Sequence, residues 1–258
     1  MQTQLNKSAS RSRGIDPFVK LEIKNARYCI KTVDQIYELE KVLSLRQKIF
    51  ASEYQLADLG MAFDIDRHDF KCDHLIIKEN ESDQIIGTYR LLCSSFTQDF
   101  YSANEFHLDE FLSAPGVKLE LGRACIDPEH RKGSVLSLLW RGIVQYALET
   151  KADYLFGCSS VKTESYLSSQ NINEALRREN KWSLNWNIGP TEPFQFTPEE
   201  RASTQMESVE LPSLLKSYLG AGAQVYGEPA YDREFHCLDY LTILKLAELK
   251  SSFEKRYG

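Results

Sequence analysis

The chain has 258 residues, an apolar fraction of 42% and a formal net charge of −6. This length predicts one large domain or two small ones, and the apolar residues are sufficient for a buried core. The negative charge argues against general binding to nucleic acid. No apolar stretch approaches the roughly 20 residues of a membrane span, and residues 1–17 lack the apolar centre of a secretory signal. We therefore expect a cytoplasmic protein, and leave open a loose, peripheral attachment to the inner membrane.

The polar residues 1–17 predict a disordered N-terminal tail, followed by a single domain at residues 18–258. In that domain, the spacing of apolar residues indicates the regular elements. We expect strands at residues 20–32, 74–78, 84–93, 119–126, 154–159 and 238–244. We expect helices at residues 33–54, 134–146, 163–178, 211–219 and 247–255. This order predicts an α/β (α+β) fold with a mixed central sheet flanked by helices.

Two segments show no regular period. Residues 56–73 are irregular and rich in acids, and residues 179–209 contain tryptophans and prolines. We expect the second segment to be a long connection that packs on the domain through its aromatic residues.

The six cysteines and five histidines show no spacing typical of a metal site or a redox motif. Most cysteines lie in apolar runs, where a reduced thiol packs as a small hydrophobic group. We therefore predict no metal site.

The central stretch, residues 119–146, reads as a strand, a basic loop and a helix. Pro128 ends the strand because it cannot donate a hydrogen bond to the sheet. The loop and the start of the helix comprise Arg131, Lys132, Gly133, Ser134 and Val135. Such a turn suits an anion, since free N–H groups and the helix dipole point at it. The alternative is an ordinary strand-to-helix turn with solvated charges.

Glu120 and Arg123 interrupt the apolar strand of this stretch. A carboxylate in an apolar strand is costly unless it is paired or faces a cleft. Positions three apart face opposite ways in a flat strand, so we expect a bulge near Gly122 that lets both side chains reach one cleft. The alternatives are a structural salt bridge and a Glu120 on a solvated face.

The acids Asp64, Asp66 and Asp69 lie close together in the irregular segment. Asp69 occupies the position at which a calcium loop requires glycine, so we exclude calcium. An acidic cleft edge would suit the ammonium group of an amine acceptor, and a solvated loop is the alternative. Arg90, in the next strand, can steer a carboxylate or brace an acid.

These features resemble known families. The strand, the Arg-x-Gly loop and the helix resemble the pyrophosphate-binding arm of the GNAT acyltransferases, although this loop keeps only Gly133. The order of Arg46, the acids, Arg90 and Glu-x-x-Arg resembles the acyl-homoserine-lactone synthases. Longer runs resemble the bacterial ornithine-lipid-type N-acyltransferases and the N-acyl amino acid synthases. These runs are FYS at 100–102, EF at 105–106, LELGR at 119–123, LLWRGI at 138–143, LFGC at 155–158, LPSLLK at 211–216 and GEPAYD at 227–232.

The resemblance implies a GNAT-like fold and transfer of a long acyl chain, often 3-hydroxyacyl, from acyl carrier protein to the α-amine of an amino acid such as ornithine. The donor would be a 4′-phosphopantetheine thioester, with no tightly bound cofactor. The resemblance implies Glu120 as the base and Arg123 as its partner. It implies acceptor-binding roles for Arg46, Asp64, Asp66, Asp69 and Arg90. It implies donor-binding roles for Ala124, Cys125, Ile126, Arg131, Lys132, Gly133, Ser134 and Val135.

Three other readings stay open: an acyl-homoserine-lactone synthase, a short-chain acetyltransferase that uses coenzyme A, and a non-catalytic lipid- or protein-binding module. The chain departs from the family pattern at residues 161–163 and 179–209. These departures leave the identity of the acceptor amino acid undecided.

Overall fold

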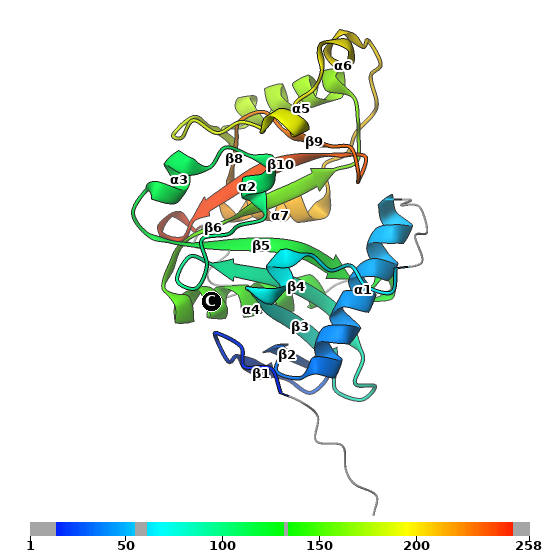
Figure 1. Cartoon of the computed structure of the whole chain (residues 1–258), viewed down its shortest axis with the longest axis vertical. Coiled ribbons are helices and arrows are strands. Elements are labelled where there is room, and N and C mark those ends of the chain that lie inside the picture. Colours follow the sequence, from blue (N-terminus) through cyan, green and yellow to red (C-terminus); the bar gives the residue numbers. More distant parts are fainter. Residues whose placement is uncertain (1–13, 55–60, 132–133, 250–258) are drawn as a thin grey trace, which may run out of the picture.

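The computed structural model describes residues 14–54, 61–131 and 134–249 (Figure 1). The described strands form one ten-stranded sheet in the order β1-β2-β3-β4-β5-β6-β10-β8-β7, and β9 pairs with β10. The strands are β1 (Glu22–Lys24), β2 (Tyr28–Thr32), β3 (Asp73–Glu79), β4 (Ile85–Cys93), β5 (Val117–Ile126), β6 (Ala152–Val161), β7 (Trp182–Ser183), β8 (Gln224–Tyr226), β9 (Ala230–Asp232) and β10 (Cys237–Lys245).

The helices lie between these strands and vary widely in length. The α-helices are α1 (Ile36–Tyr54), α2 (Ser102–Glu105), α3 (Asp109–Ser113), α4 (Ser134–Thr150), α5 (Tyr166–Arg178), α6 (Pro198–Ala202) and α7 (Ser213–Ala221). Short 3-10 turns are η1 (Arg67–Phe70), η2 (Pro128–His130), η3 (Glu192–Phe194) and η4 (Leu246–Glu248). The predicted mixed sheet flanked by helices is confirmed.

The strand directions change at the middle of the sheet. Neighbouring strands are antiparallel except for β5–β6 and β7–β8, which are parallel. Parallel neighbours require a crossover, and α4 supplies it between β5 and β6. The loop after β5 therefore leads directly into α4 beside this parallel pair.

Helices cover both faces of the sheet. In β3, Leu75 and Ile77 pack in the cluster that contains α4, whereas Ile76 packs against α1, as strand alternation requires. Phe111 of α3 belongs to the cluster on the α1 face, over β4 and β6. Tyr218 of α7 belongs to the α4 face. The sheet thus separates an α4–α7 layer from an α1–α2–α3 layer (Figure 1).

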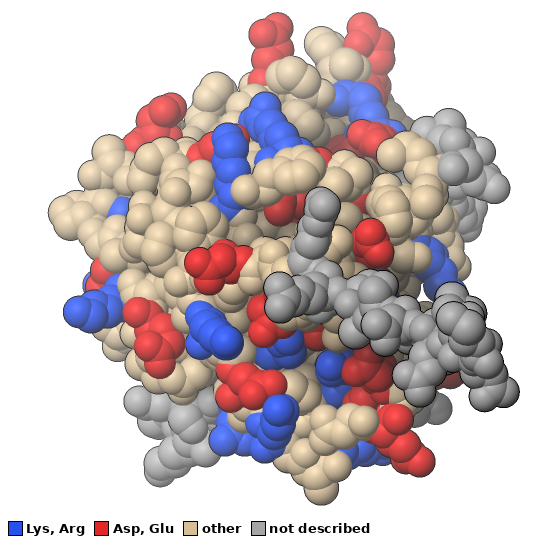
Figure 2. Space-filling model, turned by 60° about the horizontal axis from the view of Figure 1, so that its bottom comes forward, with Lys and Arg blue, Asp and Glu red and all other residues tan. Residues whose placement is uncertain are grey.

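Lysine and arginine side chains are interspersed with aspartate and glutamate over the face shown in Figure 2. None of the helices in the described part of the chain has both the length and the apolar character needed to cross a lipid bilayer.

Some predicted elements have different limits in the structure. The single strand expected at residues 20–32 is wrong, because β1 and β2 form a hairpin. The Asn25 side chain accepts hydrogen bonds from the N–H groups of Arg27 (2.9 Å) and Tyr28 (2.7 Å) and so fixes a turn. The helix expected from residue 33 begins at Ile36, because the N–H of Val33 still donates to His74 in β3.

Residues 96–111, between two predicted strands, contain the short helices α2 and α3, and the connection expected at 179–209 contains β7, η3 and α6. The predicted terminal helix at 247–255 extends beyond the described residues, which end with η4 and one further residue. Residues 1–13 of the predicted tail also lie outside them, whereas Gly14 forms a bridge to Gln35. The single-domain boundary at residue 18 stays a prediction.

Candidate active site

The strands β5 and β6 diverge near the middle of the sheet. Their parallel pairing runs from Val117 to Glu120, which pairs with Phe156, and does not continue beyond that point. Gly157 has φ of +158°, and a Cβ there would lie 2.3 Å from the carbonyl oxygen of Leu121. Only glycine allows the strands to approach so closely. Beyond this contact β6 stays paired with β10, and a gap opens on the side of β5.

A cavity of about 500 Å³ occupies this gap and reaches both faces of the sheet. On the α4–α7 face its wall is apolar and includes Tyr89, Leu121, Leu136, Leu139, Leu214 and Leu215. On the α2 face its wall contains the polar residues Ser102, Glu120, Arg123, Ser160, Asp232 and Asp239, beside the aromatic residues Phe50, Tyr54, Tyr101 and Phe235. An apolar chain on one side of the sheet can therefore meet a polar group on the other at the bulged part of β5.

The expected bulge is present in β5. Thr88 pairs with Cys125 and Arg90 pairs with Gly122, so two β5 residues, Arg123 and Ala124, stand opposite one residue of β4. Arg123 has φ of 50°, which is in the left-handed region. The bulge turns Arg123 toward the cavity that Glu120 also lines.

Glu120 accepts three hydrogen bonds from residues at the start of α2. Its side-chain oxygens accept from the N–H of Tyr101 (2.8 Å), the N–H of Ser102 (2.6 Å) and the Ser102 hydroxyl (2.5 Å). The residue is 1% exposed. Glu120 therefore holds α2 on β5, in addition to lining the cavity.

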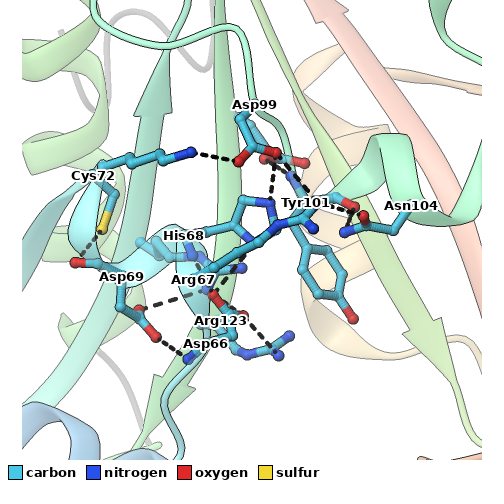
Figure 3. Close-up of polar contacts among 12 residues, drawn as sticks. Asp66, Arg67, His68, Asp69, Cys72, Asp99, Tyr101, Asn104 and Arg123 are labelled. Atoms are coloured by element: carbon cyan, nitrogen blue, oxygen red, sulfur yellow. Dashed lines mark hydrogen bonds and ion pairs between the residues drawn. The ribbon is translucent and has the colours of Figure 1, made fainter.

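Arg123 bonds to acids of the irregular segment and not to Glu120. Its guanidinium lies 3.4 Å from Asp64 and 3.3 Å from Asp66, and it stacks over the Tyr101 ring at 4.6 Å. Figure 3 shows Arg123 beside Asp66 and Tyr101.

The predicted acceptor residues come together as a network of three arginines and three aspartates. Arg46 bonds to Asp64 (2.7 Å) and Asp69 (2.6 Å), and Arg90 bonds to Asp66 (2.7 Å). Burial alone would raise the pKa of Asp66, but Arg90 and Arg123 hold it well below its ordinary value. Of the network, only Arg123 lines the cavity. The acids therefore neutralise the arginines and fix Arg123.

In the acid-rich segment, carboxylate side chains fix the local fold because they accept hydrogen bonds from backbone N–H groups of their own turn, η1. Asp66 is the N-cap of η1 and accepts from the N–H of His68 (2.7 Å). Asp69 accepts in return from the N–H of Asp66 (2.8 Å), which completes a capping box. His68 lies between Asp66 and Asp99 (Figure 3).

The residues predicted to bind the acyl donor lie at the C-terminal end of β5 or follow it in the sequence. Ala124, Cys125, Ile126 and Arg131 line the cavity. Arg131 donates from Nε to the Ile126 carbonyl (3.0 Å) and pairs with Glu53. The helix α4 begins at Ser134, and Val135 is buried against the sheet. Lys132, Gly133 and the side chain of Ser134 lie outside the described residues.

Several cavity residues were not predicted from the sequence. Cys158 donates to Ser102 Oγ and to Glu105 Oε2, both at 3.3 Å, and burial raises its pKa well above the ordinary value. Burial also raises the pKa of Cys125 to about 12. Both thiols stay protonated, which disfavours a cysteine nucleophile and an acyl-enzyme intermediate.

Asp239 is another cavity residue that was not predicted, although the sequence contains a feature that points to it. It is a lone carboxylate in the apolar run of the last predicted strand, the same feature that singled out Glu120. Glu105 and Cys158 lay in runs that carried the family resemblance, without a role of their own.

Several known proteins are similar to this chain. The family model described as "Acetyltransferase (GNAT) domain" matches residues 45–141. The L-ornithine N(alpha)-acyltransferase of Rhizobium meliloti is 31% identical over 239 residues, covering 86% of this chain and 81% of that protein. The enzyme of the same name from Brucella abortus is 31% identical over 209 residues, covering 76% and 74%. Among solved structures, FeeM, an N-acyl amino acid synthase from uncultured soil microbes, matches with a TM-score of 0.47 and 12% identity over 86% of this chain and 92% of that chain.

The two enzymes from Rhizobium and Brucella are similar to this chain over most of their own length, and the GNAT match covers β3, β4, β5 and the first part of α4. The chain therefore belongs to the GNAT-type family of L-ornithine N(alpha)-acyltransferases, and it is an acyltransferase.

Proposed function

We propose that this enzyme transfers a long acyl chain from acyl carrier protein to the α-amine of an amino acid, with ornithine as the first candidate acceptor. The cavity through the sheet is the observation that carries the proposal. Its apolar side suits a fatty chain and its polar side suits an amino acid. The names of the relatives support ornithine as the acceptor.

The donor would enter at the start of α4. Arg131 and the free N–H groups of this helix suit the phosphate of phosphopantetheine. The acyl chain would extend along Leu136 and Leu139, and the thioester carbonyl would lie beside Ala124. An N–H group between Ala124 and Ile126 would stabilise the oxyanion.

The reaction would proceed by direct attack. The acceptor ammonium loses a proton to Glu120, directly or through a water, and the nitrogen lone pair attacks the thioester carbon. The tetrahedral intermediate then expels the thiolate of the donor, the attacking nitrogen gives up its second proton to that thiolate, and the new amide remains on the acceptor. Arg123 would orient the acceptor through its carboxylate.

The product carries an apolar chain, so the proposal includes cytoplasmic synthesis with peripheral contact to the inner membrane. The acyl donor is also part of the proposal, since a coenzyme A thioester carries the same pantetheine arm. Purified enzyme offered acyl-acyl carrier protein, long-chain acyl-coenzyme A and acetyl-coenzyme A with a panel of amino acids would decide both substrates. We expect mass spectrometry to show N-acylornithine with the carrier protein. Activity with acetyl-coenzyme A alone would contradict the proposal.

Glu120→Gln is expected to lower the rate of acylation by on the order of 10²-fold, because an amide cannot accept the proton. Ser102→Ala serves as the companion, since it removes one hydrogen bond to Glu120 and keeps the carboxylate. If Glu120 is the base, the glutamine variant loses the acidic limb of the pH–rate profile and the Ser102 variant keeps it. A Glu120→Gln enzyme with unchanged turnover would remove this residue from the mechanism.

A further inference from the structure

Three buried acids lie together at the polar end of the cavity. Glu105 belongs to α2, Asp232 ends β9 and Asp239 lies in β10. They are 0%, 6% and 4% exposed. Asp232 and Asp239 line the cavity, and Glu105 lies behind them in contact with Cys158.

These acids lack the cations that the acids of the arginine network have. Within the described residues, no lysine, arginine or histidine forms an ion pair with Glu105, Asp232 or Asp239. Asp239 accepts one hydrogen bond from the hydroxyl of Ser160 (2.6 Å). The Oε1 atom of Glu105 is buried and receives no hydrogen bond from a described donor.

Buried carboxylates without a cation are costly in the free protein. Burial and the neighbouring charge of Asp232 raise the pKa of Asp239 to about 6. Burial also raises the pKa of Glu105 well above its ordinary value, and the charge of Asp239 adds to this effect. A positive ligand would remove both the desolvation cost and the repulsion.

We propose that Asp239 and Asp232, backed by Glu105, bind the side-chain ammonium group of a diamino acid acceptor and thereby select acceptors with a cationic side chain. The inference rests on the proposed function and names the residues that determine which acceptor the enzyme selects. A primary ammonium has three N–H donors, which suits carboxylate oxygens converging from several elements. Arg123 lines the same cavity while paired with Asp64 and Asp66, and its guanidinium would contact the α-carboxylate of the same molecule.

A metal ion fits this cluster less well, although Asp232, Cys237 and Asp239 place three potential ligand atoms within 4.8 Å of one another. Burial raises the pKa of Cys237 far above its ordinary value, so the thiol stays protonated, whereas metals bind the thiolate. Asp232 Oδ1 already accepts from the N–H groups of Glu234 (2.9 Å) and Phe235 (3.0 Å).

The test compares ornithine with norvaline, which has the same carbon chain and no side-chain amine. The wild-type enzyme is expected to prefer ornithine. Asp239→Asn keeps the shape and the hydrogen bond to Ser160. We expect it to lower kcat/KM for ornithine by about tenfold or more, mainly through KM. Its kcat/KM for norvaline is expected to stay the same or rise, so the selectivity collapses.

Glu149→Gln on the exposed face of α4 is the matched control and is expected to keep the wild-type selectivity. Calorimetric titration with ornithine alone, without donor, gives a second readout: Asp239→Asn should weaken binding by a similar factor. Thermal unfolding verifies that the variant is folded, and Glu105→Gln serves as a second variant with the same expected direction.

An equal loss for ornithine and norvaline in folded Asp239→Asn would overturn the inference, as would an unchanged ratio. Loss of wild-type activity in EDTA with recovery on adding Zn²⁺ would also overturn it, in favour of a metal. If the wild-type protein acylates no amino acid at all, the proposed function itself fails, and ornithine binding by calorimetry still tests the acid site.

Discussion

Buried carboxylates in this protein differ by whether an arginine lies beside them. Asp66 lies between Arg90 and Arg123 and is held in the ionised form. Asp239 has a hydroxyl as its hydrogen-bond donor, and burial shifts it toward the neutral form. The ion pairs of Asp66 stabilise the fold. The ionised form of Asp239 destabilises it, at a position where a ligand can compensate the cost.

This contrast predicts opposite effects on stability at alkaline pH. Burial raises the pKa of Asp239 from 3.8 to about 6, so its contribution is fully favourable only below pH 3.8 and is lost as the pH rises through 6. Asp239→Asn, which cannot ionise, should therefore raise the free energy of unfolding at pH 8 by on the order of 2 kcal/mol. The gain should vanish near pH 4. Urea denaturation across this pH range is the measurement.

Asp66→Asn is the companion variant and should behave in the reverse way. The lowered pKa of Asp66 means that its contribution is present above pH 3.8 and is lost as the pH falls through the lowered pKa. We expect a loss on the order of 2 kcal/mol at pH 8, since two arginines lose a shared partner. A stabilised Asp66→Asn, or a destabilised Asp239→Asn at pH 8, would contradict this account.

At the scale of elements, α4 is fixed on the sheet by a close approach. A Cβ at Gly142 would lie 2.8 Å from side-chain atoms of both Ile30 and Leu75. Gly220 in α7 has nothing within 4 Å of such a Cβ. Close packing therefore disfavours any side chain at Gly142, whereas there is space for one at Gly220.

Gly142→Ala should destabilise the protein by about 1–2 kcal/mol, because the overpacking outweighs the gain in helix propensity. Gly220→Ala should instead stabilise it by up to about 1 kcal/mol. Both changes are measurable by denaturant unfolding. Equal effects from the two variants would mean that packing of α4 does not decide the outcome at Gly142.

The long elements could be predicted from the sequence, and the short ones could not. β4, β5, β10 and α4 follow from apolar runs or helical spacing that extend over many residues. β7, β8 and β9 have only two or three residues, and tertiary pairing alone makes them strands. The turn at Asn25 depends on one side chain that accepts two hydrogen bonds, which an alternating pattern does not reveal.

At the scale of the whole molecule, the divergence of β5 and β6 divides the sheet into two halves. Among the described strands, the β5–β6 pairing that joins the halves is confined to residues 117–120 of β5. A donor bound in the cavity would contact β5 and β6 together and thereby link the two halves.

We therefore expect donor binding to slow amide hydrogen exchange in residues 121–127 of the β5 region. An acyl-phosphopantetheine at saturating concentration is the ligand, and mass spectrometry of peptides is the measurement. Residues 75–77, buried in the middle of β3, are the internal control and should not change. Equal protection of both peptides would indicate general stabilisation and not binding between β5 and β6.

The candidate site was only partly predictable, because some of its residues are close in the sequence and others are brought together only by the fold. Glu120, Arg123 and the basic loop lie within one short stretch, so a single local pattern drew attention to them. Glu105 lies far from Asp232 and Asp239 in the sequence, and the three acids meet only because α2 packs against the paired strands β9 and β10 beside the cavity. The acids at residues 64–69 were expected to face the acceptor, but no local pattern shows that Arg46, Arg90 and Arg123 neutralise them.

The contact between Gly157 and the carbonyl of Leu121 limits how deeply any molecule can enter between the two strands. A pantetheine arm bound as proposed would meet this limit, which would set the position of its sulfur atom independently of the fatty tail. The tail would instead extend among Leu136, Leu139 and Leu214, away from the reacting atoms. Chain-length preference can therefore change by substitutions between α4 and α7 while the chemistry at β5 remains unaltered.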